Sequence, residues 1–123
     1  MQVHAFLDSL APKAMKSLIE TTKGITACTD GTIGELLISM DNAGISSSWV
    51  INMPTKEEHF RPILKWSKEI AGERTLPFPS LLPTAPQAAD QVDEIADSCF
   101  SGIKIHPVYQ RFTLDDPKVL PFY

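Results

Sequence analysis

Short apolar segments alternate with amphipathic stretches along the chain. Runs of apolar and β-branched residues predict four strands, at residues 3–6, 49–53, 78–82 and 102–105. The third run is the weakest, since it contains prolines, which cannot donate hydrogen bonds to a neighbouring strand. Between the runs, apolar residues recur at the three- and four-residue spacing of a buried helix face. The pattern therefore predicts an α/β fold in which parallel βα units follow one another in the order β-α-β-α-β-α-β.

The predicted helices carry start and stop signals. A first helix is expected to begin at Ser9 and to end at Gly24. Residues 32–35 and 55–58 both have the T-x-x-E form of a capping box, in which a hydroxyl and a carboxylate satisfy the first free backbone N–H groups. Residues 84–86, Thr-Ala-Pro, are predicted to open the last of the four long helices, with proline in its first turn.

Composition narrows the class of protein. The chain has 123 residues, 43% of them hydrophobic, which is enough for one domain with a core. Eleven Lys and Arg against fifteen Asp and Glu give a formal charge of -4 without a basic run, so nucleic acid is not an expected partner. The sequence has neither a long apolar membrane span nor a signal-peptide pattern, so we expect a cytoplasmic protein. Cys28 and Cys99 lack CxxC spacing and are interpreted as reduced structural cysteines.

The segment FSGIKIHPVYQRFTLDDP, residues 100–117, places a histidine directly after the fourth predicted strand. In parallel α/β folds the functional groups lie at the carboxyl ends of the strands. His4 stands near the end of the first predicted strand, so His4 and His106 could meet at one end of the sheet. Two neutral imidazoles there would bind a divalent metal if carboxylates or water completed its shell. The alternative is that both histidines cap or pack local structure.

Residues around His106 are further candidates. Lys104 precedes it by two positions and should point to the same side of the strand, as a charge near the site or as the partner of a buried carboxylate. Tyr109 and Gln110 lie in the following loop, where they either contact substrate or hold the loop together. Residues 115–117, Asp-Asp-Pro, are predicted to end the loop and cap the next helix rather than to bind metal.

Residues 100–117 resemble the F-K-G-I-K-L-H-P-x-Y-Q-x-F-x-x-D-D-P signature of the metal-dependent amidohydrolases related to aminocarboxymuconate semialdehyde decarboxylase. Residues 3–15, VHAFLDSLAPKAM, are similar to the H-x-H-x-F-P-D-x-x-A-P-K-A opening of that family. Residues 30–56, DGTIGELLISMDNAGISSSWVINMPTK, are similar to its second unit, so the resemblance covers essentially the whole chain. It implies a (β/α)₈ barrel whose single metal, usually zinc, activates water for hydrolysis or non-oxidative decarboxylation of a small organic substrate.

The resemblance also assigns roles to individual positions. His4 matches the second histidine of the H-x-H pair and His106 matches a later metal ligand, whereas Gln2 stands where the family has the first histidine. The resemblance implies that the catalytic residues lie beyond Tyr123, while Lys104, Tyr109 and Gln110 stay the candidate substrate contacts because of their positions around His106.

A complete barrel takes about 250 residues, so residues 1–123 are expected to form a single partial domain, the first four βα units and the start of the fifth. Such a half-barrel is expected to form a homo-oligomer or to associate with the missing half, because its sheet edges and inner face would be uncovered. The alternative is a catalytically inactive α/β binding or scaffold module with the same fold. Whether the chain is an enzyme is left open, because Gln2 replaces an expected metal ligand.

Overall fold

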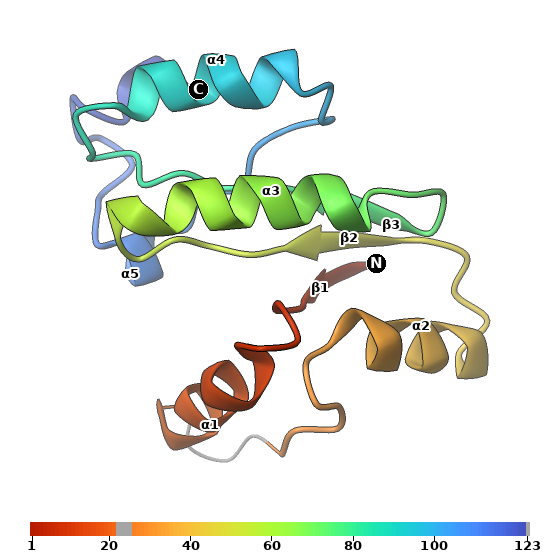
Figure 1. Ribbon diagram of the computed structural model, residues 1–123. Helices are drawn as coiled ribbons and strands as arrows, with labels where there is room; N and C mark the ends of the chain where they lie inside the picture. Colours follow the sequence, from red (N-terminus) through yellow and green to blue (C-terminus); the bar gives the residue numbers. More distant parts are fainter. Residues whose placement is uncertain (22–25, 123) are drawn as a thin grey trace. The chain divides into compact units, whose positions relative to one another are not determined.

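The computed structural model describes residues 1–21 and 26–122 (Figure 1). In this part of the chain the strands are β1 (Gln2–His4), β2 (Ser48–Ile51) and β3 (Thr75–Phe78). The α-helices are α1 (Ala11–Thr21), α2 (Ile33–Asn42), α3 (Phe60–Ile70), α4 (Ala88–Asp97) and α5 (Pro107–Gln110), and the 3₁₀ helices are η1 (Glu57–His59) and η2 (Leu120–Phe122). Within the described ranges, no helix has the length and apolar character needed to cross a membrane. The predicted end of the first helix at Gly24 lies outside the described residues.

The strands form a parallel sheet in the order β1-β2-β3. On one side of β2 the Trp49 N–H donates to Met1 O at 2.6 Å, and on the other side the Ser48 N–H donates to Arg74 O at 2.9 Å. Strands that neighbour one another in sequence order, with helices between them, are the arrangement that the alternating pattern predicts. The mixed α/β class and the sequential parallel order are therefore confirmed.

Contacts group the chain into two compact units. The first contains Met1–Val50 and Gly72–Leu76, and the second contains Ile51–Ala71 and Pro77–Tyr123. The first unit therefore holds β1, α1 and α2, and the second holds α3, α4 and α5.

In the first unit, α2 begins at the predicted capping box. The Thr32 hydroxyl accepts a hydrogen bond from the Glu35 N–H at 3.3 Å. The reciprocal half of the box is made by a different carboxylate, because the Thr32 N–H and hydroxyl donate to Asp30 Oδ1 at 2.8 and 2.7 Å. These bonds from Thr32 stabilise the carboxylate and lower the pKa of Asp30 below its usual 3.8. The helix start is thus confirmed, with Asp30 in the part that the sequence pattern gives to Glu35.

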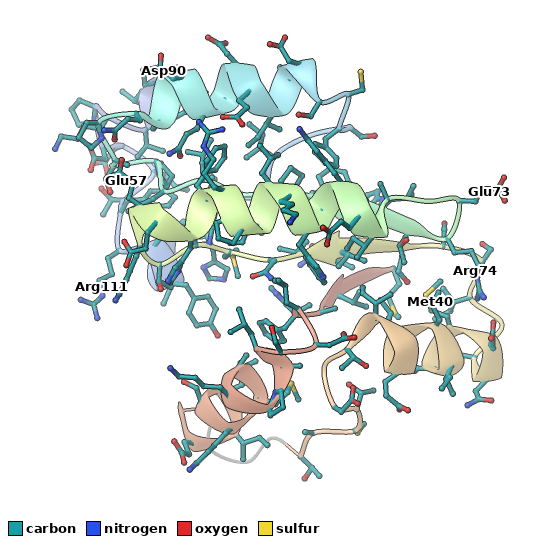
Figure 2. The ribbon with its side chains drawn as sticks, in the orientation of Figure 1. Met40, Glu57, Glu73, Arg74, Asp90 and Arg111 are labelled. Atoms are coloured by element: carbon teal, nitrogen blue, oxygen red, sulfur yellow. The ribbon has the colours of Figure 1, made fainter. Side chains whose placement is uncertain are left out.

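At its other end, α2 is held by an arginine from beyond β2. The Arg74 guanidinium pairs with Asp41 Oδ1 at 2.7 Å and donates to Ile45 O at 3.3 Å and Ser46 O at 3.4 Å. Figure 2 shows Arg74 beside α2, whose Met40 is fully buried. A guanidinium with five donors can satisfy a carboxylate and neighbouring carbonyls together, which suits it to closing the loop between α2 and β2.

The second unit contains an apolar core between α3 and α4. Its members are Phe60 and Leu64 of α3, Ala88 and Ile95 of α4, and Leu81 from the segment after β3. The predicted capping box at residues 55–58 is wrong, because the α-helix begins only at Phe60, after the 3₁₀ turn of η1. Pro62 explains the late start. It has no N–H and its ring clashes with the carbonyl four residues earlier, so it is tolerated only in the first turn of an α-helix.

Residues 102–105 do not form the predicted fourth strand. The segment has no regular secondary structure and is bonded to the residue after β3, where the Lys104 N–H donates to Pro79 O at 3.1 Å. In a parallel ladder, a residue whose carbonyl accepts from the neighbouring strand also donates its N–H to that strand, two residues earlier. Pro79 has no N–H to donate. The same proline ends β3 at Phe78, so residues 79–82 of the third predicted strand are not in the sheet.

The start of the last long helix also differs from its prediction. Helix α4 begins at Ala88, whereas residues 84–86 form turns, with the Ala85 N–H donating to Leu82 O at 3.0 Å and the Ala88 N–H to Ala85 O at 3.1 Å. Ala88 and Ile95 are buried, so the predicted apolar face of the helix is confirmed at these two positions. Burial of that face in the core, rather than the Thr-Ala-Pro signal, decides where the helix lies.

Candidate functional site

The histidine of the IKIHP segment stands at the junction of an extended segment and a short helix. His106 has extended backbone angles, φ -139° and ψ 108°, and Pro107 is the first residue of α5. Proline suits this position because its missing N–H would have no partner in the first helical turn. The helix ends at Gln110, and the next residue, Arg111, has a left-handed φ of 56° that turns the chain away.

Gln110, at the end of α5, ties this turn to the segments that follow two strands. Its side-chain oxygen accepts from the His106 N–H at 2.7 Å. Its amide nitrogen lies 2.7 Å from Leu81 O, 3.2 Å from Pro54 O and 3.4 Å from Ser80 Oγ.

Position in the chain gives these bonds their meaning. Pro54 follows β2, Ser80 and Leu81 follow β3, and His106 follows the segment of residues 102–105. The segments that follow β2, β3 and residues 102–105 therefore meet at the side chain of Gln110. Gln110 is only 4% exposed. Buried carbonyl and N–H groups need partners, and Gln110 supplies them for all of these segments. The bonds favour the structural alternative for Gln110, and its contact with substrate stays a prediction.

The imidazole of His106 carries an unusual feature. Its Nδ1 atom is buried and has no hydrogen-bond partner among the described residues. The ring packs at a tilt of 59° against Tyr109, with the ring centres 4.6 Å apart. A buried polar atom without a partner is costly, and in native proteins such an atom is a reason to look for a ligand. Tyr109 itself is exposed, so its hydroxyl can reach a molecule in solution.

Lys104 lines a second feature of this region, a cavity of about 320 Å³. The other lining residues are apolar: Leu81, Val92, Ile103, Ile105 and Phe122. The ion pairs of the described residues do not include Lys104, so the alternative of a carboxylate partner gains no support. The prediction that Lys104 and His106 point to the same side of a strand no longer applies, because residues 102–105 are not a strand.

The remaining predicted ligands lie in the first unit. His4 is the last residue of β1 and is exposed, and Gln2 is the first residue of the same strand. His4 and His106 belong to different units, so a metal shared by these two histidines stays a prediction. Within residues 1–21 and 26–122, no group of three or more His, Cys, Asp or Glu side chains is arranged to hold a metal ion.

The acidic end of the loop behaves as a cap. Asp116 Oδ1 accepts from the Lys118 N–H at 2.9 Å, and Asp116 O accepts from the Val119 N–H at 2.8 Å. The predicted capping by Asp116 is thus shown for the turn of residues 117–119, which precedes η2. A hydrogen bond from the Thr113 hydroxyl, which favours the charged form, lowers the pKa of Asp115.

No protein-family model, curated protein or solved structure matches the chain. The fold and the site define a protein of the parallel α/β class, in which the loops beyond the strands carry the chemically distinctive side chains. The distinctive geometry around His106 therefore marks the candidate functional site.

Proposed function

We propose that the chain supplies βα units of a (β/α)₈-type metal-dependent hydrolase or decarboxylase that acts on a small organic substrate. The observation that carries the proposal is the buried, unpartnered Nδ1 of His106, in a turn that Gln110 fixes to the segments after β2 and β3. The sequential parallel sheet supports it, since a barrel of this kind is built from such units. The half-barrel and its association with a second half are part of the same proposal.

The candidate metal ligands of this chain are His4 and His106. A catalytic zinc takes about three protein ligands and a water molecule, so these two histidines make an incomplete set. When bound, such a metal lowers the pKa of its water and thereby supplies a nucleophile near neutral pH. The residues around His106 have a positioning part. Gln110 holds the backbone of the histidine, and Tyr109 limits the rotation of its ring.

The substrate in this proposal carries a carboxylate. Lys104 is a half-buried cation that lines a largely apolar cavity of about 320 Å³. An ammonium group in such surroundings attracts an anionic group more strongly than it would in water. The exposed Tyr109 hydroxyl offers a second polar contact on the neighbouring turn. The carboxylate of a small acid bound in this cavity would pair with Lys104.

A catalytically inactive binding module of the same fold is the second candidate. It is favoured by Gln2, an amide in the position where the resembled family has a histidine. An uncharged amide is a weak ligand for zinc, which prefers imidazole, thiolate and carboxylate.

Zinc affinity tests the proposal. We expect the 123-residue chain to bind zinc weakly. Loss of a residue that bonds to a metal ligand weakens metal affinity about 10- to 100-fold, and we expect His106→Ala to weaken it more than this. His59→Ala, which changes a half-buried histidine of η1, is the matched control and should leave zinc affinity unchanged. Equal affinity of the wild-type chain and the His106 variant in equilibrium dialysis would exclude His106 as a ligand and leave the binding-module alternative.

A further inference from the structure

The cavity that contains Lys104 has an apolar lining with a single charged residue. Of its six lining residues, the other five are aliphatic or aromatic, and none of the six is acidic. Its volume of about 320 Å³ is at the lower end of the range for small-molecule sites. Such sites are mostly apolar and contain a few polar groups that orient the ligand. The lining therefore suits a ligand with a small apolar body and one charged group.

The apolar walls of this cavity continue the core of the second unit. Leu81 is a buried member of the core cluster, and Val92, Ile103 and Phe122 are partly buried and pack against that cluster. Leu81 follows β3, Val92 belongs to α4 and Phe122 belongs to η2, so the walls come from separate segments. Apolar surface that is only partly covered favours a ligand that removes the rest of it from water.

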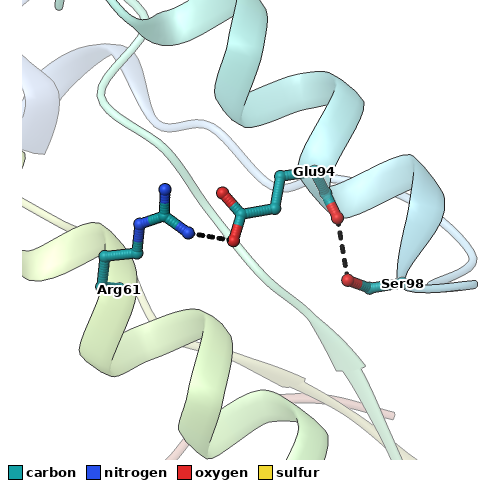
Figure 3. A network of polar contacts seen from close by, with 3 residues as sticks. All are labelled: Arg61, Glu94 and Ser98. Atoms are coloured by element: carbon teal, nitrogen blue, oxygen red, sulfur yellow. Dashed lines mark hydrogen bonds and ion pairs between the residues drawn. The ribbon is translucent and has the colours of Figure 1, made fainter.

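Helix α4, which carries Val92, is held against α3. Arg61 of α3 forms an ion pair with Glu94 of α4, whose backbone oxygen accepts from the Ser98 hydroxyl at 2.8 Å (Figure 3). An ion pair as exposed as this one contributes little by itself, so burial of the apolar face of α4 in the core does most to fix the helix. The wall at Val92 is therefore present before a ligand binds, which lowers the cost of ordering on binding.

Lys104 supplies the charge of the lining. The residue is half-buried, and the ion pairs of the described residues do not include it. A lysine can lay its methylene groups along an apolar wall and keep its ammonium group at the boundary with water. An anionic group of a ligand can pair with the ammonium group there, whereas a second anionic group against the apolar walls would have no partner. Charge complementarity therefore selects a ligand with one anionic group.

We propose that this cavity selects an aliphatic monocarboxylic acid, with its carboxylate at Lys104 and its hydrocarbon chain against the apolar walls. The inference rests on the proposed function, since it narrows the carboxylate substrate of that site to one class. Apart from Lys104, the lining has no polar side chain for the hydroxyl, amino or second carboxyl group of a more polar acid. Ile105 also lines the cavity and directly precedes His106, so one stretch of chain carries the acid site and the candidate metal ligand.

The test is calorimetric titration of the 123-residue chain with butyrate, hexanoate and octanoate, without added zinc. We expect affinity to rise by up to about fourfold for each added methylene group, because each one leaves water for an apolar wall. Suberate has the same number of carbons as octanoate and a second carboxylate. It should bind at least about tenfold more weakly than octanoate, because that second carboxylate would meet apolar side chains.

A variant of Lys104 tests the charged contact. Lys104→Met keeps an unbranched side chain and removes the charge, and we expect octanoate affinity to fall about fivefold to tenfold. Octanol, which has the hydrocarbon chain without the charge, should bind the wild-type chain and Lys104→Met equally, which shows that the cavity is intact. Lys65→Met is the matched control, since Lys65 is paired with Glu69 on α3 and does not line the cavity. It should leave octanoate affinity unchanged.

Several outcomes would overturn the inference. Absence of octanoate binding would exclude it and leave the zinc test of His106 unaffected, because that test uses no acid. Equal affinity for butyrate and octanoate, or equal losses in Lys65→Met and Lys104→Met, would mean general attraction of anions to lysines. Tighter binding of benzoate than of octanoate would mean that the site takes an aromatic acid. A dimer in sedimentation that Ile105→Lys dissociates would mean that a second copy of the chain covers the walls.

One outcome separates the inference from the proposed function. Octanoate binding that follows the expected order of ligands and variants, in a chain whose His106→Ala variant binds zinc as the wild-type chain does, would retain the ligand class. It would overturn the metal-dependent function in favour of a binding module for aliphatic acids.

Discussion

Gln110 in the second unit and Arg74 in the first unit both bind backbone carbonyls, but they differ in exposure to solvent. Each side chain holds backbone carbonyls of other segments, Pro54 and Leu81 in one case and Ile45 and Ser46 in the other. Gln110 is 4% exposed, whereas the Arg74 side chain is 41% exposed. Water can replace Arg74 when it is removed, but it reaches the partners of Gln110 only if the surrounding structure opens. Burial, rather than the number of hydrogen bonds, should therefore decide how much each residue stabilises the fold.

The largest expected effect is that of Gln110→Leu. The substitution leaves the His106 N–H and two backbone carbonyls without partners, at about 1–3 kcal/mol for each buried group. We expect the free energy of unfolding to fall by about 3–5 kcal/mol in urea denaturation, reduced where water enters. A loss below about 1 kcal/mol would mean that water already satisfies these groups and would remove the contrast with Arg74.

Gly31→Ala should come second and tests the first unit at a point where contacts are close. Gly31 has a φ of 83°, and a Cβ there would stand 2.8 Å from Met15 Sδ and 3.3 Å from Phe6 Cδ2. The left-handed conformation costs about 1–2 kcal/mol for an L-residue, and the flexible Met15 side chain can move aside. We expect a loss of about 2 kcal/mol in thermal or urea unfolding, while Gly44→Ala, at a φ of 64° in open space, should show the backbone cost alone.

Arg74→Ala is expected to be milder, despite the loss of three polar contacts. Exposed ion pairs contribute about 0–1 kcal/mol, and the carbonyls of Ile45 and Ser46 can bind water instead. We expect the urea midpoint to fall slightly and to fall further at low ionic strength than at high ionic strength, because salt screens the Asp41 pair. A loss as large as that of Gln110→Leu would show that exposure does not govern these contacts.

The smallest predicted effect depends on pH. The folded-state pKa of Asp30 is lowered by its bonds from Thr32, so its contribution to stability is present above the usual value of 3.8 and is lost as pH falls through the folded pKa. Asp115 follows the same rule, since a bond from Thr113 lowers its pKa. Between pH 5 and pH 2.5, Asp30→Asn should therefore lose less thermal stability than the wild-type chain. An identical loss in both proteins would exclude a role for Asp30 in the acid response.

Local patterns predicted what local interactions decide. The parallel order of β1, β2 and β3 follows from the alternation of strand and helix patterns, and the start of α2 follows from the Thr32 capping box. The same pattern fails at residues 55–58, because Pro62 confines the α-helix to a later start. The fourth strand fails for a similar reason, because Pro79 cannot complete the ladder with Lys104. In both cases a proline that is visible in the sequence explains why the prediction was wrong.

The candidate site was less predictable than the fold. His106 and Tyr109 stand out in the sequence, and the structure packs their rings together. The acceptors of Gln110 lie 29 to 56 residues away along the chain, so no local pattern identifies them. The unpartnered atoms of His106 and Gln91 are likewise products of packing between segments. Long-range contacts of this kind can be identified only in the folded structure.

The most direct test of the proposed function is the imidazole ¹⁵N spectrum of the protein during a zinc titration. The three histidines are His4, His59 and His106, so their ring nitrogens can be assigned by His→Ala variants. The account predicts that zinc shifts a ring nitrogen of His106 while those of His59 stay in place, and that Gln110→Leu, by freeing the turn, weakens this response about tenfold or more. Unchanged His106 nitrogens at zinc concentrations that shift His59 would contradict the account.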